Sequence, residues 1–192
     1  MVSVDRQPTL LRFEVDLGEY GAGLEIGASV SIDGVCQTVV AIVGTRVRFE
    51  AIAETLRLTT LGDLQIGSLV SVERSARVGD EIGGHEVSGH IVGTGTIQKV
   101  WKQDANVGLR IEVPPDWMRF ILHKGFIAVD GSSLTVGDVG PDWFEVHLIP
   151  ETLQRTNLGA RETGAKVNIE LDPRTVAIVE TVERVLASRG LA

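Results

Sequence analysis

An internal repeat constrains the fold of this chain more than any other feature of its sequence. Residues 33–39 (DGVCQTV) align with residues 130–136 (DGSSLTV) at a shift of 97 positions, and the first two and last two residues are identical. Without a gap, the same shift places residues 54–62 on residues 151–159, where six of nine positions are identical. Self-similarity over this length predicts two copies of one domain in tandem.

Each repeat carries the pattern of antiparallel β-structure. Apolar residues occupy every second position in runs such as 46–50 (RVRFE) and 166–170 (KVNIE), and glycines separate many of these runs. This alternation is typical of strands that bury one face. About six strands in so short a repeat predict a small closed barrel, because closure removes the exposed strand edges. The predicted fold class is all-β, with two tandem six-stranded Greek-key barrels.

One helix is predicted, at the carboxy terminus. Asp172 is a suitable N-cap and Pro173 suits the first helical position, while Gly190 ends the run. Apolar residues follow at helical spacing: Ile178, Val179, Val182, Val185 and Leu186. Such a stripe packs either on its own barrel or on the same helix of neighbouring subunits. We favour packing between subunits.

These patterns predict an amino-terminal barrel over residues 1–87, a second barrel over 88–171 and a terminal helix over 172–192. The second repeat is expected to begin near Ser88, with residues 88–97 as its first strand. At the repeat shift Met1 aligns with Gln98, so the first repeat lacks about ten residues that the second possesses. Either the first barrel closes differently, or the natural start lies upstream. We favour the upstream start, because an unpaired strand edge promotes association.

Charge and cysteine content exclude several classes of function. The formal net charge is −8 and Lys and Arg do not cluster, which argues against nucleic acid or an anionic membrane as partner. The single cysteine, Cys36, cannot form an intramolecular disulfide. Residues 1–17 have neither a signal-peptide pattern nor a membrane-spanning run. A cytoplasmic location is therefore expected.

Several motifs together resemble the riboflavin synthase family, from about residue 2 to about residue 187. They are residues 80–85 (DEIGGH), 88–90 (SGH), 124–127 (KGFI), 130–136 (DGSSLTV) and 148–153 (LIPETL). The resemblance implies two Greek-key barrels and a carboxy-terminal helix that holds a homotrimer. This agrees with the repeat and with the lone helix.

The resemblance also implies an activity. The family transfers a four-carbon unit between two molecules of 6,7-dimethyl-8-ribityllumazine, giving riboflavin and 5-amino-6-ribitylamino-uracil without a metal or organic cofactor. The working pair of pockets is formed by the amino-terminal barrel of one subunit and the carboxy-terminal barrel of the next. The trimer would then be a condition of catalysis, and lumazine synthase is a further partner that the resemblance suggests.

Cys36 and its repeat equivalent Ser133 are the first candidate catalytic residues. The reaction removes a proton from a methyl group, adds a nucleophile to the second lumazine and holds the two rings face to face. A Cys36 thiolate is suited to the addition or to proton transfer, although a small buried core residue is the alternative interpretation. The Ser133 hydroxyl can form hydrogen bonds or add weakly. The sequence therefore predicts two chemically distinct pockets.

His90 is predicted to transfer protons, because an imidazole titrates near neutral pH. His85 lies five residues earlier, and a structural role with a bond to a backbone carbonyl is an alternative interpretation for it. A metal site at these histidines is rejected, since five-residue spacing on a strand would place the rings on opposite faces. Asp172 has two interpretations of equal weight, the helix cap and a role beside the catalytic base that the resemblance implies.

The remaining candidates are expected to bind substrate. They are Thr38, Thr55, Lys124, Thr135, Ile149 and Thr152. Thr38 with Thr135, and Thr55 with Thr152, are repeat-equivalent pairs whose hydroxyls are suited to the pterin edge or the ribityl chain. For the threonines, β-branching that favours strands is the alternative explanation. For Lys124 it is a solvated surface amine.

Three departures from the family pattern concern catalysis more than fold. The sequence has no Met-Phe-Thr-Gly-Ile strand at its start, Gln37 stands where leucine is common, and Ser132 stands where an apolar residue is usual. Two rival functions follow. A lumazine or flavin carrier would keep a pocket without the reactive groups, and a scaffold would keep only the barrels. Cys36, Ser133 and His90 favour the enzyme over both.

Overall fold

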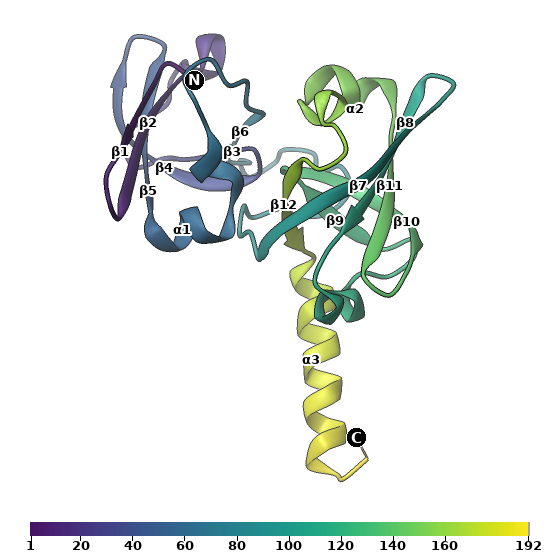
Figure 1. Cartoon of the computed structure of the whole chain (residues 1–192). Helices are drawn as coiled ribbons and strands as arrows, with labels where there is room; N and C mark the ends of the chain where they lie inside the picture. The colour runs from purple at the N-terminus through teal and green to yellow at the C-terminus, as the bar shows by residue number, and fades with distance from the viewer. Residues whose placement is uncertain (192) are drawn as a thin grey trace.

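The computed structural model describes residues 1–191, without the side chain of residue 103. It contains two six-stranded antiparallel sheets, one from each repeat, and a long helix that projects from the second (Figure 1). The predicted pair of six-stranded β-domains with a terminal helix is confirmed. The two domains differ in closure, because the second sheet forms a closed barrel and the first has two edges.

The first sheet has the order β1-β2-β5-β4-β3-β6. Its strands are β1 (Ser3–Arg6), β2 (Leu10–Asp16), β3 (Ser29–Ile32), β4 (Val35–Val43), β5 (Arg46–Ile52) and β6 (Val72–Arg74). Short helices connect them: η1 (Gly18–Gly21), α1 (Ala53–Leu58) and η2 (Thr60–Asp63). Burial alternates along β5, where Val47, Phe49 and Ala51 point into the core. This confirms the period-two pattern read from residues 46–50.

The second sheet closes in the order β10-β11-β8-β7-β12-β9. Its strands are β7 (Gly93–Gln103), β8 (Asn106–Glu112), β9 (Phe126–Val129), β10 (Ser132–Val139), β11 (Trp143–Leu148) and β12 (Lys166–Leu171), with short helices η3 (Pro115–Phe120), α2 (Pro150–Arg155) and η4 (Leu158–Ala160). Pairing of β12 with Gly93–Thr96 and of β12 with β9 completes the barrel.

The predicted first strand of the second repeat is wrong at its start, because β7 begins at Gly93 and not at Ser88. The backbone amides of Ser88 and Gly89 donate to the Glu170 carboxylate, at 2.7 and 2.9 Å, instead of to a neighbouring strand. Gly89 also has φ +78°, which interrupts an extended chain. Residues 75–92, hereafter the connecting segment, therefore cross between the domains as an irregular chain.

Two equivalent hairpin turns bring the repeats together. Asp33-Gly34 joins β3 to β4 and Asp130-Gly131 joins β9 to β10, with all four residues at positive φ. A Cβ atom on Gly34 would lie 2.3 Å from the backbone nitrogen of Gly131. The turns thus pack backbone against backbone, and only glycine fits at either position.

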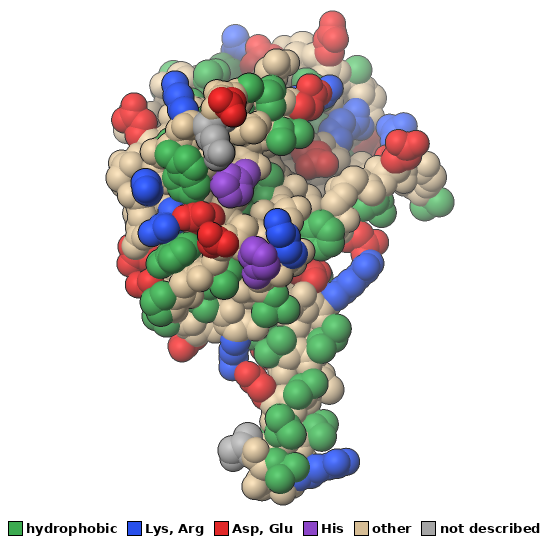
Figure 2. Space-filling model, turned by 90° about the vertical axis from the view of Figure 1, so that its right-hand side faces the viewer, with side chains coloured by type: hydrophobic (Ala, Val, Ile, Leu, Met, Phe, Trp, Pro, Cys, Tyr) green, Lys and Arg blue, Asp and Glu red, His purple; other side chains and the backbone are tan. Residues whose placement is uncertain are grey.

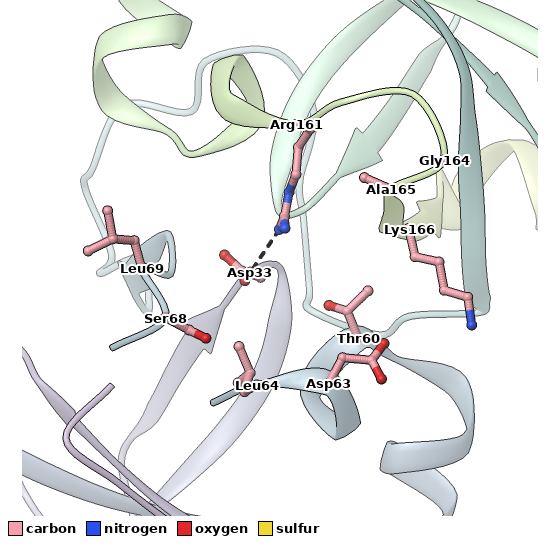
Figure 3. A pocket seen from close by; sticks show the side chains of 10 residues that line it. All are labelled: Asp33, Thr60, Asp63, Leu64, Ser68, Leu69, Arg161, Gly164, Ala165 and Lys166. Carbon is pink, nitrogen blue, oxygen red and sulfur yellow. Dashed lines mark ion pairs between the residues drawn. The ribbon is translucent and has the colours of Figure 1, made fainter. Parts of the chain in front are cut away.

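Buried polar groups surround this contact. The Arg161 guanidinium lies 2.8 Å from the Asp130 carboxylate and 3.6 Å from the Asp33 carboxylate (Figure 3), and both aspartates are almost fully buried. The Asn168 side-chain amide donates to the carbonyl of Asp33 at 2.8 Å, and its oxygen accepts from the Thr60 amide at 2.8 Å. Because Asp33 and Thr60 of the first domain pair with Arg161 and Asn168 of the second, these bonds help to specify how the domains dock.

The terminal helix α3 (Pro173–Ser188) begins as predicted. The Asp172 carboxylate accepts from the backbone amides of Arg174 and Thr175, both at 3.2 Å, and from the Thr175 hydroxyl at 2.7 Å. Within residues 1–191 no helix combines the length and apolar character that crossing a membrane requires.

The apolar stripe of α3 divides between two faces. Val176 and Val179 pack against the core of the second barrel, and Arg119 pairs with Glu183 at 2.9 Å. Beyond them the helix leaves the barrel, and apolar side chains lie along its projecting part (Figure 2). Ile178 is 65% exposed and Val182 50% exposed. This face therefore does not pack on the chain's own barrel.

Candidate functional site

A cavity of about 990 Å³ lies between the two domains. This is at the upper end of the volumes typical of small-molecule sites. Its walls come from β3 and β4, the connecting segment, the turn between β9 and β10, and the end of α2. Both repeats thus contribute to one space.

Cys36 and Ser133, the repeat-equivalent pair, both line this cavity. The hairpin turns place each of them near the start of a strand, and strand alternation turns their side chains away from the core. On β4 the neighbour Gln37 points inward and is 4% exposed, as its equivalent Leu134 does on β10 at 8%. The sequence therefore presents a thiol and a hydroxyl at equivalent places, as predicted.

The connecting segment lies against both of these residues. A Cβ atom on Gly84 would be 2.2 Å from the Ser133 hydroxyl oxygen, and one on Gly89 would be 2.7 Å from the Cβ atom of Cys36. The Cys36 amide also donates to the carbonyl of Gly89 at 3.0 Å. Both glycines have positive φ. The segment can approach the two strands this closely only because it has no side chain at these two positions.

His85 is held against the second repeat. Its Nδ1 lies 2.7 Å from the Ser133 hydroxyl oxygen, and its backbone amide donates to the same oxygen at 3.1 Å. The imidazole stacks on Phe126, with 5.3 Å between ring centroids and 21° between planes. Burial lowers the pKa of His85, partly offset by the carboxylates of Asp172 and Glu170. The ring is therefore neutral near pH 7.

His90 is exposed, and the cavity is lined by other residues. It follows Gly89, so it lies beside the strand that carries Cys36. The prediction that His85 and His90 lie on opposite faces of one strand is wrong, because residues 85–90 form no strand. His85 bonds to a serine side chain and not to a backbone carbonyl, which corrects its predicted partner. Among residues 1–191 no three His, Cys, Asp or Glu side chains gather as metal ligands.

Asp172 caps α3 beside the second barrel. Burial alone would raise the pKa of Asp172, but the hydrogen bonds from the Thr175 hydroxyl and from the amides of Arg174 and Thr175 outweigh burial and lower it. Its carboxylate is thus ionised near pH 7. The capping interpretation is confirmed, and Asp172 also acts electrostatically on His85.

The predicted binding residues lie outside the cavity. Thr38 and Thr135 are exposed on the outward faces of β4 and β10, Lys124 is exposed, and Ile149 is 57% exposed. Thr55 on α1 and Thr152 on α2 are half-buried, and their carbonyls accept from the hydroxyls of Thr59 and Thr156. Of the predicted site residues, the cavity brings together Cys36 and Ser133.

Several cavity residues were not predicted from the sequence as site residues. Ser29 and Ser31 project from β3 beside Cys36, and Glu73 projects from β6. Ser29 and Ser31 could have been found from the sequence, because serine and apolar residues alternate over residues 29–32. For Glu73 the signal is that a charged residue, aligned with Glu170, recurs inside a strand of both repeats. His85 reaches the site through the fold of an irregular segment, which local sequence does not specify.

Comparison with known proteins gives concordant matches. The family model described as "Lumazine binding domain" matches residues 2–75 and 88–172. Riboflavin synthase of Escherichia coli (strain K12) is 51% identical over 191 residues, which cover 98% of this chain and 90% of the relative. Riboflavin synthase of Chlamydia trachomatis serovar D is 44% identical over 185 residues, covering 95% and 91%.

Solved structures share the fold. LumP complexed with riboflavin superposes with a TM-score of 0.82 at 24% identity, covering 88% of this chain and 92% of that one. LumP complexed with 6,7-dimethyl-8-(1'-D-ribityl) lumazine gives a TM-score of 0.80 at 23% identity, with the same coverage. At these identities the likeness concerns the fold alone.

Proposed function

The chain belongs to the lumazine-binding family of riboflavin synthases, and from this premise we propose that its active sites form where the two repeats of neighbouring subunits meet. It is an enzyme, a transferase that converts two molecules of 6,7-dimethyl-8-ribityllumazine into riboflavin and 5-amino-6-ribitylamino-uracil. One observation supports a reactive surface on each repeat: equivalent strands present Cys36 and Ser133 on their outward faces.

Duplication suits a reaction between two identical substrates. Each repeat supplies one outward strand face for one heterocycle, and docking two such faces holds the reacting rings together. Alignment of two bound reactants can lower a barrier by about 7–11 kcal/mol in favourable models. The acidity of the methyl group comes from the electron-poor ring of the substrate, so the protein needs to supply only modest acid and base catalysis.

We assign the following roles within this proposal. Cys36 adds to the ring of one lumazine or carries its proton, and Ser133 forms a hydrogen bond to the other. His90, beside the Cys36 strand, moves the proton, and Asp172 provides a carboxylate near the second site. Binding falls to the outward residues Thr38, Thr55, Lys124, Thr135, Ile149 and Thr152.

Assembly as a homotrimer through α3 is part of the proposal. The exposed apolar face of the helix supports it, since a surface of this kind is normally buried by a partner. The exposed positions of Thr38, Lys124, Thr135 and Ile149 support it as well. They lie outside the cavity within one chain, as expected of residues whose site is completed by a neighbouring subunit.

We also propose that the protein acts in the cytoplasm and that lumazine synthase is a partner. The second proposal has a chemical basis, because a reaction that consumes two lumazines per product needs an enzyme that forms them. Co-sedimentation of the two purified enzymes tests it directly. Separate sedimentation at micromolar concentrations would contradict the partnership.

The decisive experiment follows both substrate and product. The purified protein is incubated with 6,7-dimethyl-8-ribityllumazine, and riboflavin fluorescence and lumazine absorbance are recorded together. The expected result is that two lumazines are consumed for each riboflavin formed, and that the concentration of riboflavin exceeds the concentration of protein. A carrier, the alternative function, would bind lumazine with no product. Saturable binding without riboflavin would therefore reject catalysis and support the carrier.

A further inference from the structure

The connecting segment brings one histidine to each repeat, and the histidine at the second repeat has no assigned role. Gly89, which precedes His90 in the chain, lies at Cys36, whereas Gly84 and His85 lie at Ser133. Glu170 anchors the segment between them through the amides of Ser88 and Gly89. The fold of this segment therefore fixes the contact between His85 and Ser133.

The contact uses two groups of His85 on one oxygen. The Ser133 hydroxyl oxygen has two lone pairs and one proton. The backbone amide of His85 donates to one lone pair at 3.1 Å, and Nδ1 of the imidazole lies 2.7 Å from the same oxygen. Whether Ser133 donates or accepts toward Nδ1 decides what its hydroxyl can offer to a ligand.

The surroundings of the other ring nitrogen determine the direction of this bond. Nε2 of His85 is fully enclosed and has no hydrogen-bond partner among the described residues. A neutral imidazole carries one N–H, on either Nδ1 or Nε2. A proton on Nε2 would leave a buried donor unpaired, which proteins tolerate less often than an unpaired acceptor. The favoured form therefore carries its proton on Nδ1, which donates to Ser133.

Packing holds the ring in this orientation. Phe126 stacks on the imidazole at 5.3 Å between centroids, and it pairs across the sheet with Thr135 on the same strand as Ser133. Because Gly84 has no side chain, the backbone of the connecting segment can lie directly over the Ser133 hydroxyl. The stack thus fixes the plane of the ring, and the hydrogen bond with Ser133 fixes which edge of the ring faces the hydroxyl.

We propose that His85 is a positioning residue that fills both lone pairs of the Ser133 oxygen and so makes its hydroxyl a dedicated hydrogen-bond donor to the substrate. The acceptor is a carbonyl oxygen or an unprotonated ring nitrogen of the heterocycle, both of which a lumazine presents. This inference rests on the proposed function of the second repeat. It distinguishes the two repeats chemically: Ser133 donates a hydrogen bond to the substrate, whereas the equivalent residue Cys36 acts as a nucleophile.

The first test is spectroscopic and needs no change in the contact. Long-range ¹H–¹⁵N correlation spectra of histidine-labelled protein at pH 7.5 report which ring nitrogen carries the proton, with His85 assigned by the loss of its signals in His85→Phe. The expected signature is a protonated Nδ1 and an unprotonated Nε2. A ring protonated on Nε2 would overturn the proposal.

The second test measures turnover in matched variants. His85→Phe keeps a ring on Phe126 and removes the donor, so kcat is expected to fall at least tenfold. His85→Asn places an amide N–H near the position of Nδ1 and is expected to restore most of this loss. His147→Phe, at an exposed histidine on β11, is the control and should leave kcat within about twofold.

A double-mutant cycle then asks whether His85 acts through Ser133. Ser133→Ala alone should lower kcat about as much as His85→Phe, and the double variant should lower it no further. Losses that multiply in the double variant, or an unchanged kcat in His85→Phe, would overturn the proposal. Thermal unfolding of each variant identifies any that fails to fold. If His85→Phe fails to fold, the turnover of His85→Asn decides whether an N–H donor at this position is sufficient.

The outcomes separate this inference from the proposed function. An active wild-type chain with a fully active His85→Phe variant rejects the role of His85 and leaves the function standing. A wild-type chain that binds lumazine without forming riboflavin rejects the function, and the inference falls with it.

Discussion

Cys36 and Ser133 occupy equivalent positions and illustrate how duplication followed by divergence acts on single residues. The same hairpin turn and the same strand alternation place both side chains on the outward face at the cavity. The backbone around the two is nearly the same, so their different chemistry comes from the side chain and from what contacts it. Gly89 packs on Cys36, while His85 bonds to Ser133.

Replacement of Cys36 by serine tests its chemical role with minimal change of shape. Cys36→Ser is expected to lower kcat at least tenfold while the Kd for lumazine changes less than threefold, because a hydroxyl is a far weaker nucleophile than a thiolate at neutral pH. Stopped-flow turnover and fluorescence titration measure the two quantities. Equal turnover in both proteins would remove Cys36 from the mechanism.

Gln37 places a polar side chain in the core of the first domain. Its Nε2 donates to the carbonyl of Cys36 at 2.8 Å, but its buried Oε1 has no hydrogen-bond partner among the described residues. Gln37→Leu is expected to raise the free energy of unfolding by about 1 kcal/mol, because the unpaired oxygen is removed. Urea denaturation measures it. The reciprocal control Leu134→Gln should lower the same quantity by about 2 kcal/mol.

At the scale of elements, α3 begins at a cap and ends away from the barrel. The Asp172 carboxylate accepts hydrogen bonds from the first amides of the helix, and its negative charge raises the pKa of His85. Val176 and Val179 fasten the start of the helix to the barrel core, while the rest of the apolar stripe is left exposed. One residue therefore caps the helix and also raises the pKa of His85.

Two substitutions at Asp172 separate the cap from the charge. Asp172→Asn keeps a good N-cap, so the free energy of unfolding should change by less than about 1 kcal/mol, whereas Asp172→Ala should lower it by about 1 kcal/mol. If the carboxylate acts in the second site, both variants lose at least tenfold in kcat. Full activity in Asp172→Asn would restrict the residue to capping. Chemical denaturation and steady-state kinetics give the two readouts.

At the scale of the molecule, a buried charge cluster controls how the two domains dock. Asp33 and Asp130 share the guanidinium of Arg161, and its pairing with Asp33 is drawn in Figure 3. Burial, the dominant cause, and the nearby Asp33 together raise the pKa of Asp130 to about 7, against the opposing effect of Arg161. Burial likewise raises the pKa of Asp33.

This cluster predicts a dependence of stability on pH. The pKa of Asp130 is about 7 in the folded protein against 3.8 for the free side chain, so the folded state binds the additional proton between these values. The free energy of unfolding should therefore rise as pH falls from 8 to 5.5, relative to Asp130→Asn, by about 1–2 kcal/mol. Urea denaturation at both pH values measures it. Parallel curves for the two proteins would contradict the shift.

The assembly prediction also belongs to the whole molecule. Val182→Glu places a charge on the exposed apolar face of α3, where Val182 is 50% exposed within one chain. If α3 holds the proposed trimer, the assembly should dissociate at micromolar concentration, and turnover should fall with it because each proposed site needs two subunits. Analytical ultracentrifugation and kinetics report both. The control Glu180→Lys, at an exposed polar position of the same helix, should leave assembly intact. An active monomer would reject the intersubunit site.

Much of this protein is determined by the sequence alone. The repeat at a shift of 97 residues, the alternation in runs such as 46–50 and the Asp172-Pro173 start of the helix predict two β-domains, their strand faces and the final element. These features are local, because hydrophobic period and capping act within a few residues. They also place Cys36 and Ser133 at equivalent outward positions.

Only the tertiary structure decided how these parts meet. The contact of Gly34 with Gly131, the sharing of Arg161 by two aspartates and the bond from His85 to Ser133 join residues far apart in the sequence. No periodicity encodes such contacts, since they depend on how two folded surfaces and an irregular segment pack in three dimensions. The strands follow from neighbouring residues, whereas the cavity between the repeats follows from the docking of the two domains.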